Sequence, residues 1–310
     1  MKKELTWSWP IASYLFLGGL GGGIAIVSAV ADIFFGLGGI FAMGPFIAAV
    51  IIGLASGLLV FELGKPLRFW RVVVTKKLSE MTFGAWMLTL LMVAGLVYSS
   101  CWLRLLPWYG LEGLRQAFAW ICLILGIGVA LYTGVFLGTM KSRPFWNGPA
   151  LPVLFLILSL STGLAAQILI VSIWPWGGNT SQAADITPLL GAANIGFLVL
   201  EGIILLVYVF MMRTSVTVRA SGPAASWLNG TRALIFWIGA VIAGILLPIV
   251  LYSLQITVTA IAAALLVLAG GAILRFLVVY TGERIMFPGE EEFLAWLPEG
   301  DEAFLRAWEK

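Results

Sequence analysis

The chain contains no histidine in 310 residues. Haem b in a membrane protein is usually held by two imidazoles, so this chain cannot hold it in that way. Histidine is also the commonest neutral ligand for zinc and copper, and the side chain that titrates most easily near neutral pH. Any proton or electron chemistry must therefore use carboxylates, tyrosines, backbone groups and borrowed cofactors, with no metal site of its own.

Cysteine and charge are scarce as well. The two cysteines, Cys101 and Cys122, stand in apolar stretches without CxxC spacing. An iron–sulfur cluster needs about four thiolates, so we predict none in this chain and interpret both cysteines as small core residues. Charged residues make up 11% of the sequence, against roughly 25% in soluble domains. With 61% hydrophobic residues, the composition predicts an all-α polytopic membrane protein.

Eight apolar stretches are long enough to cross a bilayer, which takes about 20 residues each. The breaks between them contain glycine, proline or charge, and the break between the last two is the least marked. The eight predicted spans cover residues 11–35, 44–64, 82–106, 117–140, 150–174, 187–212, 232–252 and 257–281.

A weak internal repeat relates the two halves of the sequence. Leu15-Phe16-Leu17 in the first span matches Leu154-Phe155-Leu156 in the fifth, and Glu62 matches Glu201 at the same offset. A repeat of four spans keeps its orientation and predicts two parallel four-helix bundles. A chance match is the alternative, because the sequence is so rich in leucine.

This repeat predicts three parts. Residues 1–141 form the first four-helix bundle and 142–282 the second, followed by a tail over 283–310. The tail is acidic and amphipathic, and the segment 65–80 is basic and aromatic. We interpret both as docking surfaces; the alternative for the tail is a helix lying on the membrane surface.

Eight spans place both termini on one side, here named side A, and the opposite side is side B. Of the 18 Lys and Arg residues, 15 fall on side A, two on side B and one inside a span. The positive-inside rule then predicts that side A is cytoplasmic and that the protein lies in the cytoplasmic (inner) membrane. The two side B cations are Arg104 and Arg115, and the intramembrane one is Arg275.

Carboxylates inside spans are costly and therefore mark candidate functional sites. Glu62 stands near the side A end of the second span, followed by Lys65 and Arg68. It either pairs with these cations or accepts protons and hydrogen bonds from a polar ligand.

Glu201 stands midway along the sixth span, with no basic residue within a helical turn. It either pairs across helices, for example with Arg275, or belongs to a proton path. Asp32 lies near the side B end of the first span and is favoured as an interfacial residue. We include Glu201, Asp32 and Arg275 as proton-path candidates.

The first span contains five glycines in six positions after Tyr14, among them Gly18, Gly19 and Gly22. Such a run allows close helix packing, or a groove in which a flat ring lies against the backbone. In the fourth span, Tyr132 and Thr133 could offer a phenol and a hydroxyl to a quinone carbonyl. Both also suit ordinary packing.

Three motifs resemble the NrfD/PsrC family of integral membrane subunits of polysulfide-reductase-type complexes. They are Trp9-Pro10-Ile11-Ala12-Ser13-Tyr14 with Leu15-Phe16-Leu17-Gly18-Gly19, Glu62-Leu63-Gly64-Lys65-Pro66-Leu67-Arg68-Phe69-Trp70, and Tyr132-Thr133-Gly134 with Arg143-Pro144-Phe145-Trp146-Asn147. The eight-span layout agrees with this resemblance.

The resemblance implies a haem-free membrane anchor that exchanges electrons between the quinone pool and a molybdopterin oxidoreductase. Its partners would be a four-cluster ferredoxin-like iron–sulfur subunit and the molybdopterin catalytic subunit, and its cofactor menaquinone, favoured over ubiquinone. The implied quinone site lies in the first bundle towards side A, with Glu62 and Tyr132 reactive and Tyr14, the glycine run, Lys65, Arg68 and Thr133 binding.

Two questions stay open at the level of sequence: which compartment side A faces, and which class of function the protein has. Several members of the family work with periplasmic catalytic subunits, whereas the charge bias places side A in the cytoplasm. A different class of function also fits, a secondary transporter with Glu201 as the coupling carboxylate. A third activity, proton translocation between the two bundles, is compatible with the quinone anchor.

Overall fold

The computed structural model describes residues 9–62, 80–173, 180–216 and 218–282, and these residues form helices joined by short loops, without a strand. Within the described part, eight helices are long and apolar enough to cross a membrane. Because no water reaches the hydrocarbon core, a helix that satisfies its own backbone is the structure such sequences adopt. The protein is therefore an integral membrane protein of the predicted all-α class.

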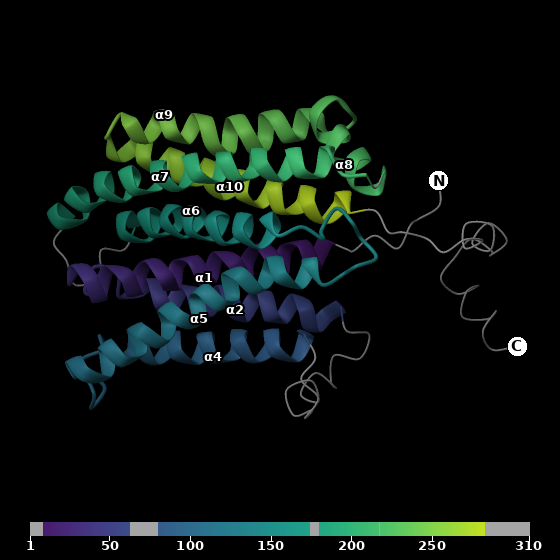
Figure 1. The fold of residues 1–310 in the computed structure, drawn as a ribbon. Coiled ribbons are helices and arrows are strands. Elements are labelled where there is room, and N and C mark those ends of the chain that lie inside the picture. The colour runs from purple at the N-terminus through teal and green to yellow at the C-terminus, as the bar shows by residue number, and fades with distance from the viewer. Residues whose placement is uncertain (1–8, 63–79, 174–179, 217, 283–310) are drawn as a thin grey trace, which may run out of the picture.

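The helices follow one another in a simple order (Figure 1). Those in the first half are α1 (Trp9–Phe35), α2 (Met43–Glu62), α4 (Glu80–Ser100) and α5 (Glu112–Gly138). Those in the second half are α6 (Ala150–Ile173), α7 (Thr180–Arg213), α8 (Val218–Asn229), η2 (Ile235–Leu246), α9 (Leu247–Ser253) and α10 (Thr257–Thr281).

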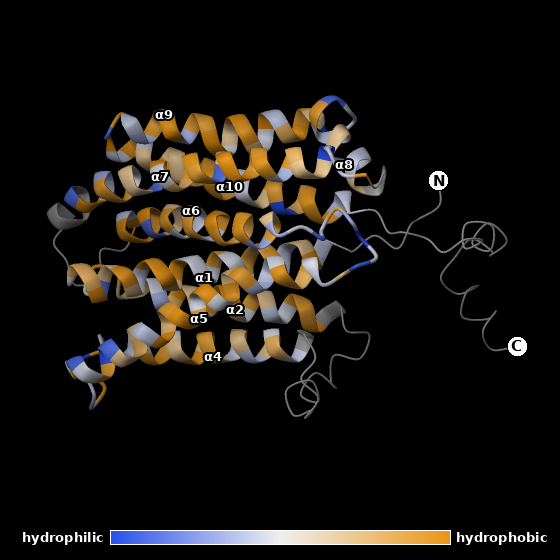
Figure 2. Ribbon diagram, in the orientation of Figure 1, coloured by the Kyte–Doolittle hydropathy of each residue, from blue (hydrophilic) through white to orange (hydrophobic). Residues whose placement is uncertain are grey.

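The spans run alternately up and down, so α1 begins and α10 ends at the same end of the molecule (Figure 1). That end is side A. Hydrophilic residues gather at the two ends of the helices, while the middle of each span is largely apolar (Figure 2). This banding is the pattern expected of a bilayer-spanning bundle.

Neighbouring helices within each half pack side by side: α1 on α2 and α5, α2 on α4, and α6 on α7 and α10. However, α1 packs against α6 about as extensively as against its neighbours in the first half, and α1 also contacts α10. The structure therefore has no loose boundary between halves, and the division into two separate four-helix bundles stays a prediction.

The contact between α1 and α6 depends on two glycines. A Cβ atom added to Gly163 of α6 would overlap the backbone of Gly23 in α1, and a Cβ on Gly23 would overlap the carbonyl of Ser159. Small residues of this kind let membrane helices approach to backbone contact. Gln167 of α6 adds hydrogen bonds to the Ile24 carbonyl at 3.2 Å and to the hydroxyl of Ser28.

The seventh span departs from α-helical geometry. Its first part, η2, is a π-helix, and the amide of Leu247 still bonds five residues back to Ile242. Gly244 in η2 faces Gly270 of α10, where an added Cβ would lie 2.9 Å from the Gly270 Cα. Pro248, which lacks an amide hydrogen, follows at the start of α9, where the backbone returns to α-helical bonding.

Most predicted spans agree with the helices to within a few residues, including the break at Ser253–Ile256, where Gln255 has a φ of +55°. The third span was predicted to end at residue 106, but α4 ends at Ser100. The loop that follows is closed by the Trp108 indole, which donates to Ser100 Oγ at 3.0 Å. The short helix α8 was not predicted.

Candidate functional site

Aromatic side chains gather near side A in the first half of the molecule. Tyr132 of α5 packs between Phe83 of α4 and Phe136, with ring centroids 6.2 and 5.7 Å away. Its phenol lies directly over Gly84 of α4, where any Cβ would overlap the ring. Tyr14 of α1 is 3% exposed, and its phenol is close enough to that of Tyr132 to interact with it electrostatically.

Thr133 stands beside this aromatic group. Its hydroxyl is buried and donates to the Ala130 carbonyl at 2.8 Å, which leaves the oxygen able to accept. Gly18 of α1 faces the Thr133 methyl group at an ordinary contact distance, 3.8 Å from where its Cβ would lie. The structure thus brings together Tyr14, Gly18, Tyr132 and Thr133, four of the residues that sequence pointed to.

Other predicted ligand-binding residues cannot be placed in this group. Glu62 ends α2, while Lys65 and Arg68 lie outside the described residues. The tail over 283–310 also lies outside them.

Gly19 and Gly22 are occupied by helix packing. A Cβ on Gly22 would lie 3.0 Å from the carbonyl oxygen of Gly126 in α5, and one on Gly19 would overlap the guanidinium of Arg275. Of the two roles considered for the glycine run, close packing is the one observed at these two positions. Ligand contact by Gly19 and Gly22 stays a prediction.

Arg275 of α10 is fully buried and reaches across to α1 and α6. Its Nη1 donates to the carbonyl oxygens of Leu15 and Phe16 at 2.6 and 3.0 Å. Its Nη2 donates to Ser159 Oγ at 2.7 Å and to the Phe155 carbonyl at 3.3 Å. The guanidinium also lies 5.1 Å from the centroid of the Phe155 ring, a cation–π contact. One side chain therefore ties three helices together.

Glu201 of α7 is 3% exposed, and Ser161 of α6 donates a hydrogen bond to its Oε2 at 2.6 Å. The Arg275 donors are directed to carbonyl and hydroxyl groups, so the direct Glu201–Arg275 ion pair considered from sequence is not formed between these two described residues. The two groups are still close enough for their charges to interact. Two serines of α6 that stand two residues apart bind them separately: Ser159 accepts from Arg275, and Ser161 donates to Glu201.

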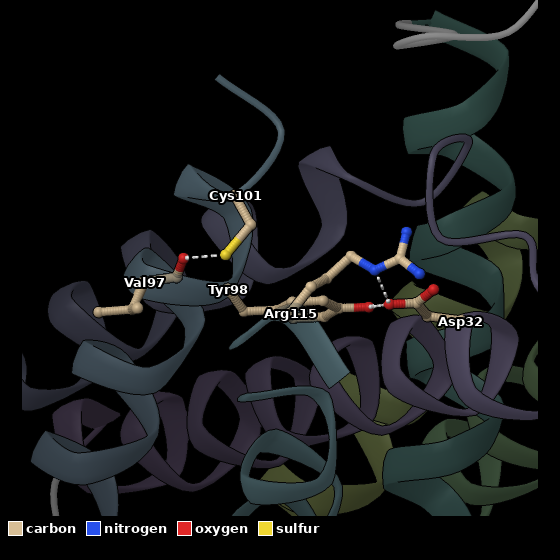
Figure 3. Close-up of polar contacts among 5 residues, drawn as sticks. All are labelled: Asp32, Val97, Tyr98, Cys101 and Arg115. Carbon is tan, nitrogen blue, oxygen red and sulfur yellow. Dashed lines mark hydrogen bonds and ion pairs between the residues drawn. The ribbon is translucent and has the colours of Figure 1, made fainter. Parts of the chain in front are cut away.

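Asp32 belongs to a separate polar cluster near side B (Figure 3). Tyr98 of α4 donates to its Oδ2 at 2.8 Å, and Arg115 of α5 places Nε 3.5 Å from the same oxygen. The Arg115 guanidinium lies 4.9 Å above the ring of Trp102. This arrangement agrees with the interfacial interpretation of Asp32, and its part in a proton path stays a prediction.

Sequence reasoning missed the partners in these clusters. Ser159, Ser161 and Tyr98 each complete a buried polar contact, yet none was singled out. The one signal was the polar run Ser159 to Thr162 in an otherwise apolar span. Within the described residues, no group of three or more His, Cys, Asp or Glu side chains could hold a metal ion.

Comparison with known proteins agrees with the motifs. The family model described as "Polysulphide reductase, NrfD" matches residues 1–287. The sequence is 30% identical to the C chain of polysulfide reductase from Wolinella succinogenes, over 92% of this sequence and 96% of that protein. It is 28% identical to protein NrfD of Escherichia coli, over 91% and 96%. Because the family model spans nearly the whole sequence, this protein belongs to the NrfD family of polysulphide reductase membrane proteins.

Proposed function

We propose that this protein is the haem-free, quinone-reactive membrane subunit of a larger oxidoreductase. Its partners would be a four-cluster ferredoxin-like iron–sulfur subunit and a molybdopterin catalytic subunit of the polysulfide, thiosulfate, sulfite or dimethyl sulfoxide reductase type. Family membership supports this, as does the similarity to a protein whose name makes it one subunit of a polysulfide reductase. Because the sequence has no histidine for haem and too few cysteines for a cluster of its own, we propose that its electrons are exchanged with a partner's cluster.

The observation that carries the proposal is the group at Tyr14, Tyr132 and Thr133. A quinone head group is a flat ring with two carbonyl oxygens, so it requires hydrogen-bond donors and apolar or aromatic walls. The phenols of Tyr14 and Tyr132 can donate, and the rings of Phe83 and Phe136 supply aromatic walls. The Thr133 hydroxyl already donates to Ala130, so it can accept a hydrogen bond from the head group of a quinol. Gly18 keeps the α1 backbone on this side free of a side chain.

A bound quinone takes up two electrons and two protons to become a quinol. The protein's task is to hold the head group and to deliver protons at the right atoms. We assign Tyr132 as the donor to one carbonyl oxygen, with Tyr14 and Thr133 positioning the ring. Glu62, at the end of α2, is proposed to supply protons from side A. Menaquinone is favoured over ubiquinone.

Further assignments belong to the same proposal. Side A faces the cytoplasm of a cell whose inner membrane holds the protein, and the segments 65–80 and 283–310 dock the iron–sulfur partner there. The protein also translocates protons, with Glu201 and Arg275 in the path. The parts 1–141 and 142–282 act as the quinone-binding and proton-conducting units.

Tyr132→Phe tests the quinone site, because it keeps the ring that packs on Gly84 and removes only the hydroxyl. Loss of one hydrogen bond to the head group should weaken binding of dimethylnaphthoquinone, a menaquinone analogue, by about three- to tenfold. Quenching of tryptophan fluorescence in the purified complex measures this affinity, and quinol oxidation by the same sample measures turnover. Tyr109→Phe, in the side B loop, is the matched control and should leave both unchanged.

Wild-type affinity in Tyr132→Phe, together with unchanged turnover, would remove Tyr132 from the site. The partner assignment has its own test. The affinity-tagged protein should co-purify with an iron–sulfur protein whose clusters are reduced by added quinol. Quinol oxidation by this subunit alone in the membrane would contradict the proposed assembly.

A further inference from the structure

We propose that protons reach Glu201 from side B along a polar track on the inner face of α7, formed by Thr187, Asn194 and Glu201 with Tyr252 of α9. The inference rests on the proposed proton translocation and gives it a route and a direction. It differs from a path through Asp32, which the sequence analysis included as a candidate.

The spacing of these residues places them on one face of the helix. Thr187, Asn194 and Glu201 follow one another at intervals of seven residues, close to two turns of an α-helix. They are 1%, 0% and 3% exposed, whereas Leu189 and Leu206 of the same helix are largely exposed on the lipid side. At about 1.5 Å per residue, the track runs roughly 21 Å along α7.

Buried polar groups in a membrane span are costly and therefore indicate a role. Asn194 donates from Nδ2 to the Tyr252 hydroxyl at 3.2 Å, while its Oδ1 is buried and has no partner among the described residues. An unsatisfied buried amide oxygen costs about 1–3 kcal/mol unless a water molecule bonds to it. We infer that a water molecule binds at Asn194 Oδ1.

Tyr252 extends the track, and the sequence makes room for it. Its ring lies against Gly191 of α7, one turn from Asn194, and a Cβ on Gly191 would be 3.0 Å from the ring. Because the Tyr252 oxygen accepts the bond from Asn194, its own O–H can donate to a further acceptor such as water. Tyrosine and threonine hydroxyls can each pass a proton on, and Asn194 orients the water between them.

The residues at the two ends of the track suit the entry of a proton at side B and its acceptance at Glu201. At side B, Asp185 is exposed two residues before Thr187 and presents a carboxylate to the solvent. At the inner end, Glu201 is held by Ser161 of α6, two residues along that helix from Ser159, the partner of Arg275. A proton from side B water would convert the Glu201 carboxylate to the acid, and the reverse step would release it. No other bond is made or broken.

A second possible proton route, along α1 from Asp32, is blocked where α1 and α6 are in contact. Ser28 and Gln167 meet on the side B part of the α1–α6 contact, and Gln167 Oε1 is also buried without a partner in the described part of the protein. Asp32 stands one turn nearer side B on α1, bound to α4 and α5. Further in, however, the backbones at Gly23 and Gly163 are in contact, so no water fits between them. A proton on Asp32 therefore has no direct way along this seam to Glu201.

The experiment compares the two routes in the intact complex, reconstituted into proteoliposomes with a pH dye inside. Asn194→Val and Tyr252→Phe should lower the number of protons moved per quinol by about tenfold or more, the loss expected when a positioned proton-transfer group is removed. Quinol oxidation with an uncoupler should stay at the wild-type rate. Glu201→Gln should behave like Asn194→Val, and Gln167→Leu, at the other polar position, should behave like the wild type.

The outcomes distinguish failure of the proposed proton translocation from failure of the track alone. If the wild-type complex oxidises quinol but moves no protons, proton translocation by this protein is wrong, and the track falls with it. If the wild type moves protons and Gln167→Leu abolishes this while Asn194→Val does not, the track alone is overturned. Should Asn194→Val fail to assemble, Thr187→Val makes the same test nearer the surface, with the same expected loss.

A second measurement does not depend on turnover. In a cysteine-free background, Thr187→Cys should react with a membrane-impermeant methanethiosulfonate reagent added from side B and not from side A. Leu189→Cys, on the lipid face of the same helix, is the control and should react slowly from both sides. Equal labelling of the two positions would show that water does not enter along Thr187, against the proposed track.

Discussion

Arg275 is a cation in the middle of a membrane protein, and its hydrogen-bond partners among the described residues are neutral: three carbonyl oxygens and the Ser159 hydroxyl. A planar guanidinium with five donors can serve two helices at once, which the compact ammonium of lysine cannot. The choice of arginine at this position is thus explained by geometry rather than by charge. The nearby Glu201 carboxylate adds a favourable field without touching it.

Arg275→Lys tests this interpretation. The variant keeps the charge but loses at least one of the two sets of bonds, which should destabilise the protein by about 2–3 kcal/mol. The midpoint of thermal unfolding of the purified protein, followed by tryptophan fluorescence, should fall by several degrees. Arg115→Lys is the control: that side chain is 21% exposed, and lysine keeps the charge that faces Asp32, so the loss of stability should be smaller. A larger effect at Arg115 than at Arg275 would contradict the argument.

At the scale of helices, some glycines lie in backbone contact with another helix, as in the α1–α6 contact, and others do not. Gly163→Ala would force a methyl group into the backbone of Gly23, and overpacking of this kind costs about 1–3 kcal/mol. Gly196, within α7, has no atom of the described residues within 4 Å of its Cβ position. Gly196→Ala should therefore be neutral, or stabilise by about 0.5–1 kcal/mol because glycine has the lower helix propensity.

The measurement is again the thermal midpoint, taken on both variants in the same detergent. We expect the midpoint to fall in Gly163→Ala and to stay unchanged or rise in Gly196→Ala, although the chemical change is the same. No loss of stability in Gly163→Ala would mean that α1 and α6 are separated further than the structure shows.

The sequence predicted the helices well because each span is a continuous apolar run of sufficient length. It failed where hydropathy carries no information. Residues 101–106 are apolar but form a loop, and α8 is too short and too polar to resemble a span. The π-helical bonding of η2 left no recognisable pattern in the sequence.

For the site, the residue types could be found but not their partners. Tyr132, Glu201 and Arg275 stood out as polar groups in apolar surroundings. Which helix faces which is a property of the tertiary packing, so the contacts of Glu201 with Ser161 and of Asp32 with Tyr98 could not be predicted. Asn194 stands seven residues before Glu201, and this spacing gained meaning only once both side chains proved to be buried.

At the scale of the whole molecule, the described residues contain an even number of spans, with α1 beginning and α10 ending on side A (Figure 1). The basic residues on that side predict that it is cytoplasmic. A green fluorescent protein fused after Lys310 should therefore fluoresce in cells, and an alkaline phosphatase fused there should be inactive. A phosphatase fusion within the side B loop, after Gly110, should be active. The opposite pair of results would place the termini in the periplasm.

The way Arg275 crosses between the halves has a mechanical consequence. A carrier that works by alternating access has to swing one half of the molecule away from the other to expose its substrate. Here such a swing would have to pull the guanidinium from its acceptors on α1, the carbonyls of Leu15 and Phe16, and part the backbones at Gly23 and Gly163. The fold is thus poorly suited to alternating access and better suited to a fixed frame.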